Sequence, residues 1–345
     1  MKLHPATVVV TGSGTVTCQS IIKALRMQDE LAVKIVTVDA SDQVAGRYFS
    51  DAFHKIPLAN DPSYVDALVE VCERHRADLL VPIVDYEFKP ISCAVERFGD
   101  IGCMVAISPA DVIARTNNKL ETYRFFLDNG FATARTWDAD EARRNSLNLP
   151  YPVFLKPAVD GRSSIDCYKV STAQDLEMYL NQVPSAMVQE FVSAPEFTAD
   201  VLADWDSHVL GIVVRERIET KGGVSYKGVT VDDPLMTEEV TRLVHALGIT
   251  GPANIQAFRR GTEVLFNEIN PRFSGALALS LAAGMNSPLL LVKLALGMPV
   301  SDVLGRTRVG VTMLRYWTEV FVGPDGKPEY PDYRLAPLGV CLRAS

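Results

Sequence analysis

The sequence lacks the cysteine patterns that mark disulfide-stabilised and zinc-binding proteins. Its 6 cysteines are scattered, with no C-x-x-C pair and no histidines at zinc-ligand spacing: Cys18, Cys72, Cys93, Cys103, Cys167 and Cys341. Such scatter is typical of reduced cysteines in a cytoplasmic protein, which is the location we expect. The first residues also lead almost directly into an apolar strand, without a signal-peptide pattern.

Long apolar runs and an excess of positive charge are missing as well. The most apolar region, 276–300, is interrupted by Gly284, Asn286, Pro288 and Lys293, so it predicts two packed helices rather than a membrane span. Lys and Arg number 34 against 42 Asp and Glu, which gives a net charge of −8. This balance argues against nucleic acid and membrane surfaces as partners.

The composition that remains is that of a soluble globular protein, with 48% hydrophobic and 22% charged residues. Because 345 residues exceed one ordinary core, we expect several subdomains. The predicted divisions are an α/β domain at 1–112, a linking helix and small subdomain at 113–192, a larger subdomain at 193–305 and an extension at 306–345. In the first domain, apolar strands alternate with amphipathic helices, which predicts a parallel sheet; the strands are 7–11, 33–39 and 79–84, and the helices 16–27 and 63–75.

Two stretches of this first domain are candidates for facing a ligand. The turn Gly12-Ser13-Gly14 resembles a dinucleotide-binding fingerprint, with Asp39 ending the second strand, but Thr17 stands where the third glycine belongs. We therefore favour a strand-to-helix turn near a substrate pocket over an NAD site. Asp85 and Glu87 follow the third strand at its carboxyl end, where open α/β sheets place ligands. Contact with the acceptor substrate and a plain polar loop both stay open for these two residues.

The densest polar cluster lies in two apolar segments, 253–258 and 263–269, which alternate as strands do. Side chains of a strand alternate between faces, so an odd-length loop at 260–262 would bring the polar residues of both strands to one face. That face then holds Asn254, Gln256, Glu268 and Asn270. The alternative is an ordinary hairpin with a polar end.

The chemistry of this cluster favours a metal site. A buried carboxylate with amide oxygens is unfavourable unless a cation or ligand satisfies it. Carboxylate and carbonyl oxygens suit Mg²⁺ or Mn²⁺ held together with substrate phosphates. Arg272 follows directly, as a fixed cation that can meet a phosphate or a developing negative charge.

Two lysines and a donor-rich loop precede this hairpin. Lys119 lies in the first turn of a helix predicted at 118–129, where a cation opposes the helix dipole unless it meets an anion; an exposed, solubilising Lys is the alternative. Lys156 is the one charge in the apolar strand at 151–157, and a buried Lys needs a partner. The next loop has amides and hydroxyls that can wrap a phosphate chain, unless it is a plain hairpin turn: Asp160, Gly161, Arg162, Ser163 and Ser164.

The order of these signals resembles the ATP-grasp superfamily over roughly residues 1–305. A Lys after an α/β domain is followed by V-F-L-K-P, a donor-rich loop, Q-E-F-V and then E-I-N-P-R-F-S-G, of which E-I-N-P-R is the sharpest motif. The chain is most similar to the carbamoyl-phosphate synthetase large-subunit and biotin carboxylase branch, as a stand-alone carboxylate–amine ligase-like protein. The resemblance implies an α/β ATP-grasp fold with an N-terminal Rossmann-like preATP-grasp domain.

The resemblance also implies where ATP binds. Lys119 and Lys156 hold the phosphates, and the loop 160–164 is a mobile lid over the triphosphate. Glu196 takes the ribose hydroxyls. The adenine hinge, which bonds the base largely through backbone groups, is formed by Glu190, Phe191 and Val192.

The remaining implied roles concern the metal and the substrates. The metal ligands for Mg²⁺ or Mn²⁺ are Gln256, Glu268 and Asn270. Arg272 stabilises the acyl phosphate and, with Lys156, is an implied catalytic residue. Two basic residues are implied to face the phosphates or the acid substrate: one is Arg215 or Arg217, and the other is Lys221.

The activity that the resemblance implies is ligation. ATP phosphorylates a carboxylate to an acyl phosphate, and an amine then attacks to give an amide, ADP and phosphate. The chain has one copy of the pattern, no G-x-C-x-G glutaminase nucleophile and no biotin-carrier lysine, which points away from carbamoyl phosphate synthesis and biotin carboxylation. The expected partners are a small-molecule carboxylate and an amine, and a homodimer is left open. The alternatives are an ATP-grasp kinase or carboxylating enzyme, and a catalytically silent nucleotide-binding regulatory subunit.

Overall fold

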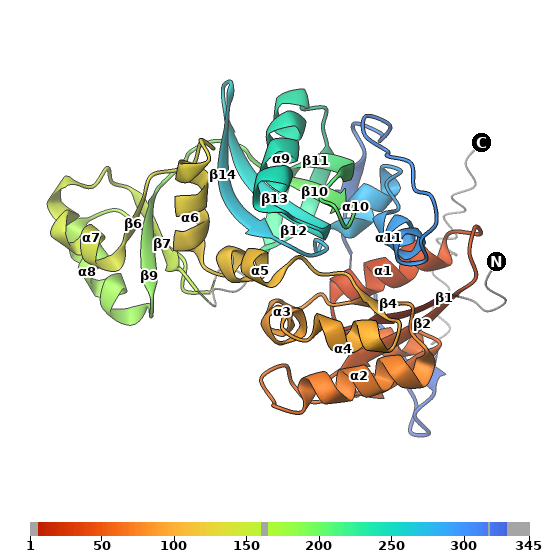
Figure 1. The fold of residues 1–345 in the computed structure, drawn as a ribbon. Coiled ribbons are helices and arrows are strands. Elements are labelled where there is room, and N and C mark those ends of the chain that lie inside the picture. The colour runs from red at the N-terminus through yellow and green to blue at the C-terminus, as the bar shows by residue number, and fades with distance from the viewer. Residues whose placement is uncertain (1–5, 160–164, 317, 330–345) are drawn as a thin grey trace. The chain divides into compact units, whose positions relative to one another are not determined.

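The structure is a computed structural model that describes residues 6–159, 165–316 and 318–329 (Figure 1). The chain divides into two compact units, 1–314 and 315–345. The first unit contains three sheets, one parallel and two antiparallel, which confirms the predicted α/β class. Among the described residues, no helix is both long enough and apolar enough to cross a membrane.

The N-terminal domain is a parallel sheet in the order β3-β2-β1-β4-β5, as the alternation of strands and helices predicted. Its strands are β1 (Ala6–Val10), β2 (Val33–Asp39), β3 (Ala52–Lys55), β4 (Leu79–Val81) and β5 (Met104–Val105). Its helices are α1 (Val16–Arg26), α2 (Tyr64–His75), α3 (Asp85–Ser92) and α4 (Val95–Asp100). The prediction missed β3 and β5, because strands of 4 and 2 residues have too little alternation to be seen in a sequence.

The middle of the chain forms a small antiparallel sheet in the order β6-β9-β7-β8. Its strands are β6 (Thr136–Asp138), β7 (Val153–Pro157), β8 (Tyr168–Val170) and β9 (Ala186–Glu190), and its helices are α7 (Ala139–Arg144) and α8 (Ala173–Gln182). Two helices, α5 (Ala110–Thr116) and α6 (Lys119–Asp128), come before it in the chain. Helix α6 begins where predicted, because the Asn118 side chain caps it by accepting from the amides of Leu120 and Glu121.

The third sheet is antiparallel and has the order β14-β13-β10-β11-β12-β15. Its strands are β10 (Glu196–Ala203), β11 (Val209–Lys221), β12 (Val224–Thr230), β13 (Gly251–Arg260), β14 (Glu263–Asn270) and β15 (Thr312–Leu314). Its helices are α9 (Pro234–Leu247), α10 (Leu277–Ala282) and α11 (Ser287–Ala295). The apolar region at 276–300 therefore folds into two helices, as predicted. The second unit holds the hairpin of β16 (Phe321–Val322) and β17 (Pro328–Glu329).

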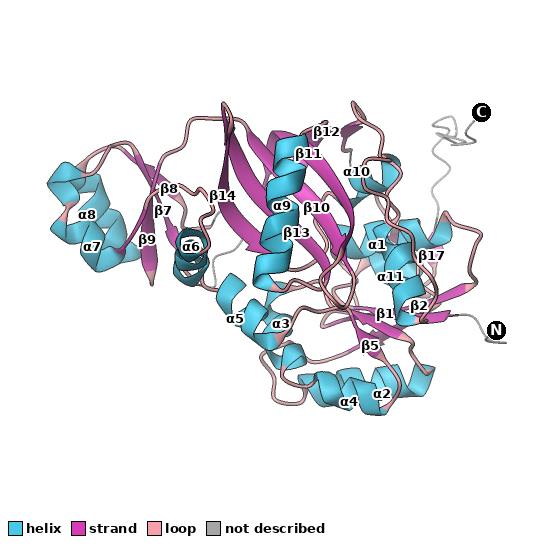
Figure 2. Cartoon of the chain, turned by 45° about the horizontal axis from the view of Figure 1, so that its top comes forward, coloured by secondary structure: helices cyan, strands magenta, loops and turns pink. Residues whose placement is uncertain are grey.

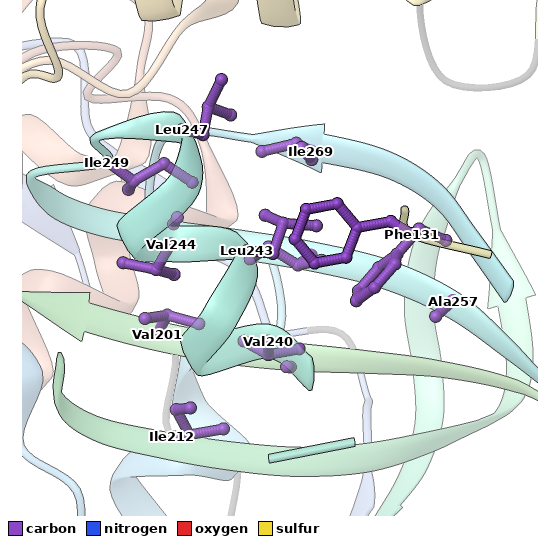
Figure 3. Close-up of a cluster of buried hydrophobic side chains, with 14 of the residues drawn as sticks. Phe131, Val201, Ile212, Val240, Leu243, Val244, Leu247, Ile249, Ala257 and Ile269 are labelled. Carbon is purple, nitrogen blue, oxygen red and sulfur yellow. The ribbon is translucent and has the colours of Figure 1, made fainter. Parts of the chain in front are cut away.

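Helix α9 covers one face of this third sheet with an apolar core (Figures 2 and 3). Val240, Leu243 and Val244 of the helix pack against alternate strand residues such as Val201 and Ile212. Burial of such side chains contributes about 25 cal/mol per Å² of apolar surface. The neighbouring side chains along each strand point to the opposite face. That face carries polar residues such as Asn254 and Arg215 beside apolar ones such as Leu202. The core thus fixes which strand residues are left to build a site.

Candidate active site

The polar face of the third sheet lines a cavity of about 850 Å³. Residues from the N-terminal domain and from both antiparallel sheets contribute to its wall, including Thr15 and Asp85 at the starts of α1 and α3 and Lys156 from β7. Its volume lies within the range of about 300–1,000 Å³ that is usual for small-molecule sites. Most of the residues singled out from the sequence line this one cavity.

The hairpin β13–β14 brings the predicted polar cluster together. Asn254 pairs with Asn270, and Gln256 pairs with Glu268, so these four residues share one face of the sheet. All four line the cavity. The predicted common face is therefore present.

The predicted reason for this register is wrong, however. Arg260 pairs with Glu263, so the loop has two residues rather than three. Glu268 still meets Gln256 because Asn267 is an extra residue, a β-bulge, between Phe266 and Glu268. The bulge shifts the register by one and turns the Asn267 side chain towards Lys156.

Lys156 is buried at the centre of this wall, with 6% of its surface exposed. Its ammonium donates to Gln189 Oε1 at 3.2 Å and to Asn267 Oδ1 at 3.0 Å. Burial lowers the pKa of Lys156 to about 8, and the nearby Glu268 carboxylate partly offsets this effect. A cation whose partners are neutral amides keeps its charge available for an anion such as a phosphate.

Lys119 and Glu268 face each other at the first turn of α6. The Lys119 ammonium lies 3.8 Å from Glu268 Oε1, a loose ion pair, and 29% of the Glu268 side chain is exposed. Glu268 supplies a carboxylate, and the neighbouring Gln256 and Asn270 supply amide oxygens. One carboxylate with neutral oxygens is the donor set that Mg²⁺ uses when phosphates complete its coordination. The residues therefore fit a magnesium ion held jointly with a phosphate chain.

A second group of predicted residues lines the cavity at the end of β9. Glu190, Phe191 and Val192 are all part of its wall. The Phe191 ring lies under the Lys169 ammonium, 4.1 Å from it, and Glu190 Oε1 lies 3.5 Å from Arg260 Nη1. An apolar ring in a cavity wall is a suitable surface for a planar base.

Glu196 and Arg217 form an ion pair beside this group. Arg217 Nη1 donates to Glu196 Oε1 at 2.5 Å and to Gln256 Oε1 at 3.0 Å, and its Nη2 donates to the carbonyl of Gly223 at 2.8 Å. Arg217 therefore links the predicted ribose residue to the predicted metal ligand.

Arg215 lies deeper, in a buried network. Its guanidinium donates to both carboxylate oxygens of Asp200, at 3.0 and 3.2 Å, and to the hydroxyls of Ser225 and Ser274. Ser274 also accepts from the amide of Ala276 at 2.9 Å. Arg215 thus holds the segment that follows Arg272 and still lines the cavity.

Arg272 and Asp85 join the hairpin to the N-terminal domain. Arg272 Nε donates to Asp85 Oδ1 at 2.5 Å, and Nη2 donates to Oδ2 at 3.1 Å. Nη2 also lies 3.3 Å from Asn270 Oδ1. Both partners line the cavity, which places a fixed cation and a carboxylate beside the predicted metal ligands.

Glu87 does not face the cavity and is no longer proposed as a substrate residue. Helix α3 begins at Asp85, so Glu87 lies in its first turn rather than in a loop and points inward, with 3% exposed. Its carboxylate accepts from Tyr64 Oη and from the amides of Ile83 and Val84, the last two at 2.7 Å. Burial raises the pKa of Glu87, and these hydrogen bonds oppose the rise. The residue ties α3 to the sheet.

Contacts within the N-terminal domain occupy the glycine turn that follows β1. Asp39 Oδ2 accepts from the amide of Gly14 at 2.9 Å, which occupies a carboxylate oxygen that a ribose would need. Gly46 packs so closely that a Cβ on it would lie 2.1 Å from the carbonyl oxygen of Ser13. This geometry supports the substrate-facing turn over the NAD site, and Thr15 and Thr17 beyond it line the cavity.

Lys221 stands apart from the cavity wall. The Lys221 ammonium lies 3.7 Å from the centre of the Tyr226 ring and 3.8 Å from Glu219, and Lys221 does not line the cavity. The loop of Asp160, Gly161, Arg162, Ser163 and Ser164 lies outside the described residues.

Comparisons with known proteins agree on one kind of domain. Residues 182–316 match the family described as ATP-grasp in the biosynthetic pathway with Ter operon, and residues 8–106 match the PylC-like N-terminal domain. The carbamoyl phosphate synthase large chain of Thermotoga petrophila is 30% identical over 212 residues, which are 56% of this chain and 18% of that protein. The D-alanine–D-alanine ligase of Desulforudis audaxviator is 32% identical over 187 residues, which are 46% of this chain and 60% of that protein. The chain thus spans less than two thirds of the length of these relatives.

Solved structures show the same architecture. The biotin carboxylase domain of 2-oxoglutarate carboxylase from Hydrogenobacter thermophilus, in complex with MgADP, ADP and bicarbonate, matches with a TM-score of 0.70. The match covers 90% of this chain and 74% of that chain at 15% identity. The chain has an ATP-grasp fold. Its N-terminal domain is PylC-like, and the predicted superfamily is therefore confirmed.

The sequence prediction missed several residues of this cavity, among them Gln189 and Asn267, which are the partners of Lys156. Asn267 had a signal: two consecutive polar residues, Asn267 and Glu268, break the alternation of an apolar strand, which is what a bulge does. Gln189 had a weaker one, as the amide in an otherwise apolar segment of β9.

Proposed function

We propose that the chain is an ATP- and Mg²⁺-dependent ligase that activates a carboxylate as an acyl phosphate and joins it to an amine. The observation that carries this proposal is the convergence of Lys119, Lys156, Glu268 and Arg272 on one cavity. A loosely paired carboxylate, two lysines and an arginine make a site for a phosphate chain and its metal. No protein nucleophile is needed, since phosphoryl transfer depends on positioning and charge neutralisation.

The nucleotide has a complete set of candidate contacts. Lys119 and Lys156 hold the phosphates, the segment from Glu190 to Val192 receives the base, and Glu196 takes the ribose hydroxyls. Gln256, Glu268 and Asn270 would hold Mg²⁺, which, when bound, neutralises negative charge on the phosphate oxygens. Two relatives are named carbamoyl phosphate synthase and D-alanine–D-alanine ligase, and the structural neighbour is a biotin carboxylase domain with bound MgADP, which supports the same assignment.

The reaction then has two steps. A carboxylate oxygen of the acid attacks the γ-phosphorus, and the bond from phosphorus to ADP breaks. Lys156 and Arg272 stabilise the negative charge of the acyl phosphate. The amine nitrogen then attacks the carbonyl carbon, and phosphate leaves with the electrons of the carbon–oxygen bond. Closure of the cavity would exclude water from the acyl phosphate.

A carboxylating enzyme is the second candidate, in which bicarbonate is the acid. The observation that favours it is the structural match to a biotin carboxylase domain that holds bicarbonate. At 15% identity this match supports the fold, so bicarbonate enters the experiment as one acid among others.

The experiment is an acid screen with hydroxylamine as the nucleophile. Purified protein, ATP and Mg²⁺ are mixed with the twenty proteinogenic amino acids, small dicarboxylic acids and bicarbonate, one at a time. The proposal expects one acid class to give ADP and a hydroxamate together, detected by mass spectrometry. ADP with phosphate placed stably on a hydroxyl would indicate a kinase. Nucleotide binding without any turnover would indicate a regulatory subunit.

A further inference from the structure

We propose that Asp85 binds the amine substrate as an ammonium ion and takes its proton, an assignment that rests on the ligase function proposed above. A primary amine is protonated at neutral pH and has no free electron pair for attack. A ligase that uses such an amine needs an anion to bind the ammonium and a base to receive its proton. The cavity offers few groups for this task.

Among the described residues of the cavity wall, the carboxylates are Asp85, Glu190, Glu196 and Glu268. Glu268 faces Lys119 beside the candidate metal ligands, and Glu196 is held by Arg217. Glu190 lies near Arg260 at the hinge segment. These three have contacts or positions that belong to nucleotide binding, whereas Asp85 comes from the N-terminal domain.

Asp85 is also the carboxylate best exposed to an incoming cation. Its side chain is 55% exposed, against 29% for Glu268 and 28% for Glu196. It lies at the first residue of α3, where the helix dipole stabilises a negative charge. The surrounding wall contains Thr15, Thr17 and Tyr86, whose hydroxyls suit a small polar body.

The pairing with Arg272 connects this anion to the reacting group. Arg272 donates hydrogen bonds from Nε and Nη2 to the two carboxylate oxygens of Asp85. The acyl phosphate would compete for the same guanidinium, since carboxylate and phosphate bind its fork in the same way. As Arg272 turns to the phosphate, the oxygens of Asp85 become free for the ammonium. The exchange places the amine nitrogen next to the activated carbonyl.

The proton and electron balance of the step is simple. The ammonium gives one proton to a carboxylate oxygen of Asp85, which leaves a lone pair on nitrogen. That pair forms the new carbon–nitrogen bond, and the carbon–oxygen bond to phosphate breaks. Phosphate leaves with the bonding electrons and takes the second proton of the nitrogen, so that a neutral amide results, and Asp85 returns its proton to solvent.

The test compares a charged nucleophile with a neutral one in the same enzyme. Hydroxylamine is largely neutral at neutral pH, whereas ammonium chloride, ethanolamine and glycine supply ammonium groups. With the acid that the hydroxamate screen selects, Asp85→Asn should lower the ratio of amide to hydroxamate at least tenfold, and Asp85→Glu should recover part of it. Asp66→Asn is the matched control, because Asp66 also pairs with an arginine, Arg97, but on the surface and outside the cavity wall.

Each other outcome overturns the assignment. An equal fall in both products would mean that Asp85 only positions Arg272. An unchanged ratio, or a wild-type enzyme that makes hydroxamate but no amide from any of the three amines, would also exclude Asp85 as the amine site. A wild-type enzyme that makes neither ADP nor hydroxamate would refute the ligase function itself, and this result is distinct from the others.

Discussion

Glu87 and Glu268 are two glutamates next to apolar strand sequences, and their carboxylates have opposite surroundings in the structure. Glu87 accepts hydrogen bonds from Tyr64 and from the amides of Ile83 and Val84, within its own domain. Glu268 faces a lysine 3.8 Å away and a cavity. A buried carboxylate that its own domain satisfies serves the fold, whereas one left short of donors is poised for a ligand. Sequence position alone did not separate these two cases.

The largest effect should come from removing the poorly satisfied carboxylate. Glu268→Ala is expected to lower Mg²⁺-dependent ADP formation by on the order of 100-fold or more, because it deletes the one charged candidate ligand. Thermal unfolding should change little. Glu263→Ala is the matched control, an exposed glutamate on the same strand that pairs with Arg260. Normal turnover by a folded Glu268→Ala protein would refute the metal site.

Removing the hydrogen-bonded carboxylate of Glu87 should instead lower stability and leave turnover intact. Glu87→Ala leaves the hydroxyls of Tyr64 and Thr11 and the amide of Val84 without their acceptor, so the free energy of unfolding should fall by about 2–4 kcal/mol. Denaturant unfolding measures this loss, with Glu96→Ala on the exposed side of α4 as the control. Turnover by the protein that stays folded should persist. A stable Glu87→Ala protein without turnover would reverse the roles assigned to the two glutamates.

A smaller effect should appear in the pH dependence of ATP binding, through the charge of Lys156. Burial lowers its pKa to about 8, so its ammonium is charged below this pH and neutral above it. The affinity for ATP should therefore weaken as the pH rises through about 8. Lys156→Arg, whose guanidinium stays charged, should flatten the profile. An identical pH profile in both proteins would show that Lys156 does not hold the phosphates.

The sequence predicted most of the large elements and the polar face of the hairpin. Long apolar segments such as β2 and β14 were found with bounds within one residue of those observed. β13 was found too, but it extends two residues beyond the predicted segment 253–258 at each end. The two-residue turn and the bulge at Asn267 were not found, because they compensate each other in the register. The alternation of side chains therefore predicted correctly that the polar residues share one face of the sheet. It gave the wrong reason for their register, which is the bulge and not the loop length.

The burial of Glu87 could not be predicted because its hydrogen-bond partners are far away in the chain. Tyr64 and Thr11 come from a helix and a strand end that meet only in the folded sheet. The helix itself had a signal, since Asp85 and Glu87 are acidic residues of a first helical turn. Pro90 inside the helix obscured it. The same long-range folding brings Asp85 to Arg272, a pairing separated by 187 residues.

The most direct test of the ligase function follows oxygen from the acid to phosphate. The acid selected by the hydroxamate screen is labelled with heavy oxygen in its carboxylate, and the inorganic phosphate released during amide formation is analysed by mass spectrometry. If an acyl phosphate forms, one labelled oxygen must appear in each phosphate, because the bond that breaks lies between the carbonyl carbon and that oxygen. Phosphate without label, released together with amide, would contradict the proposed mechanism.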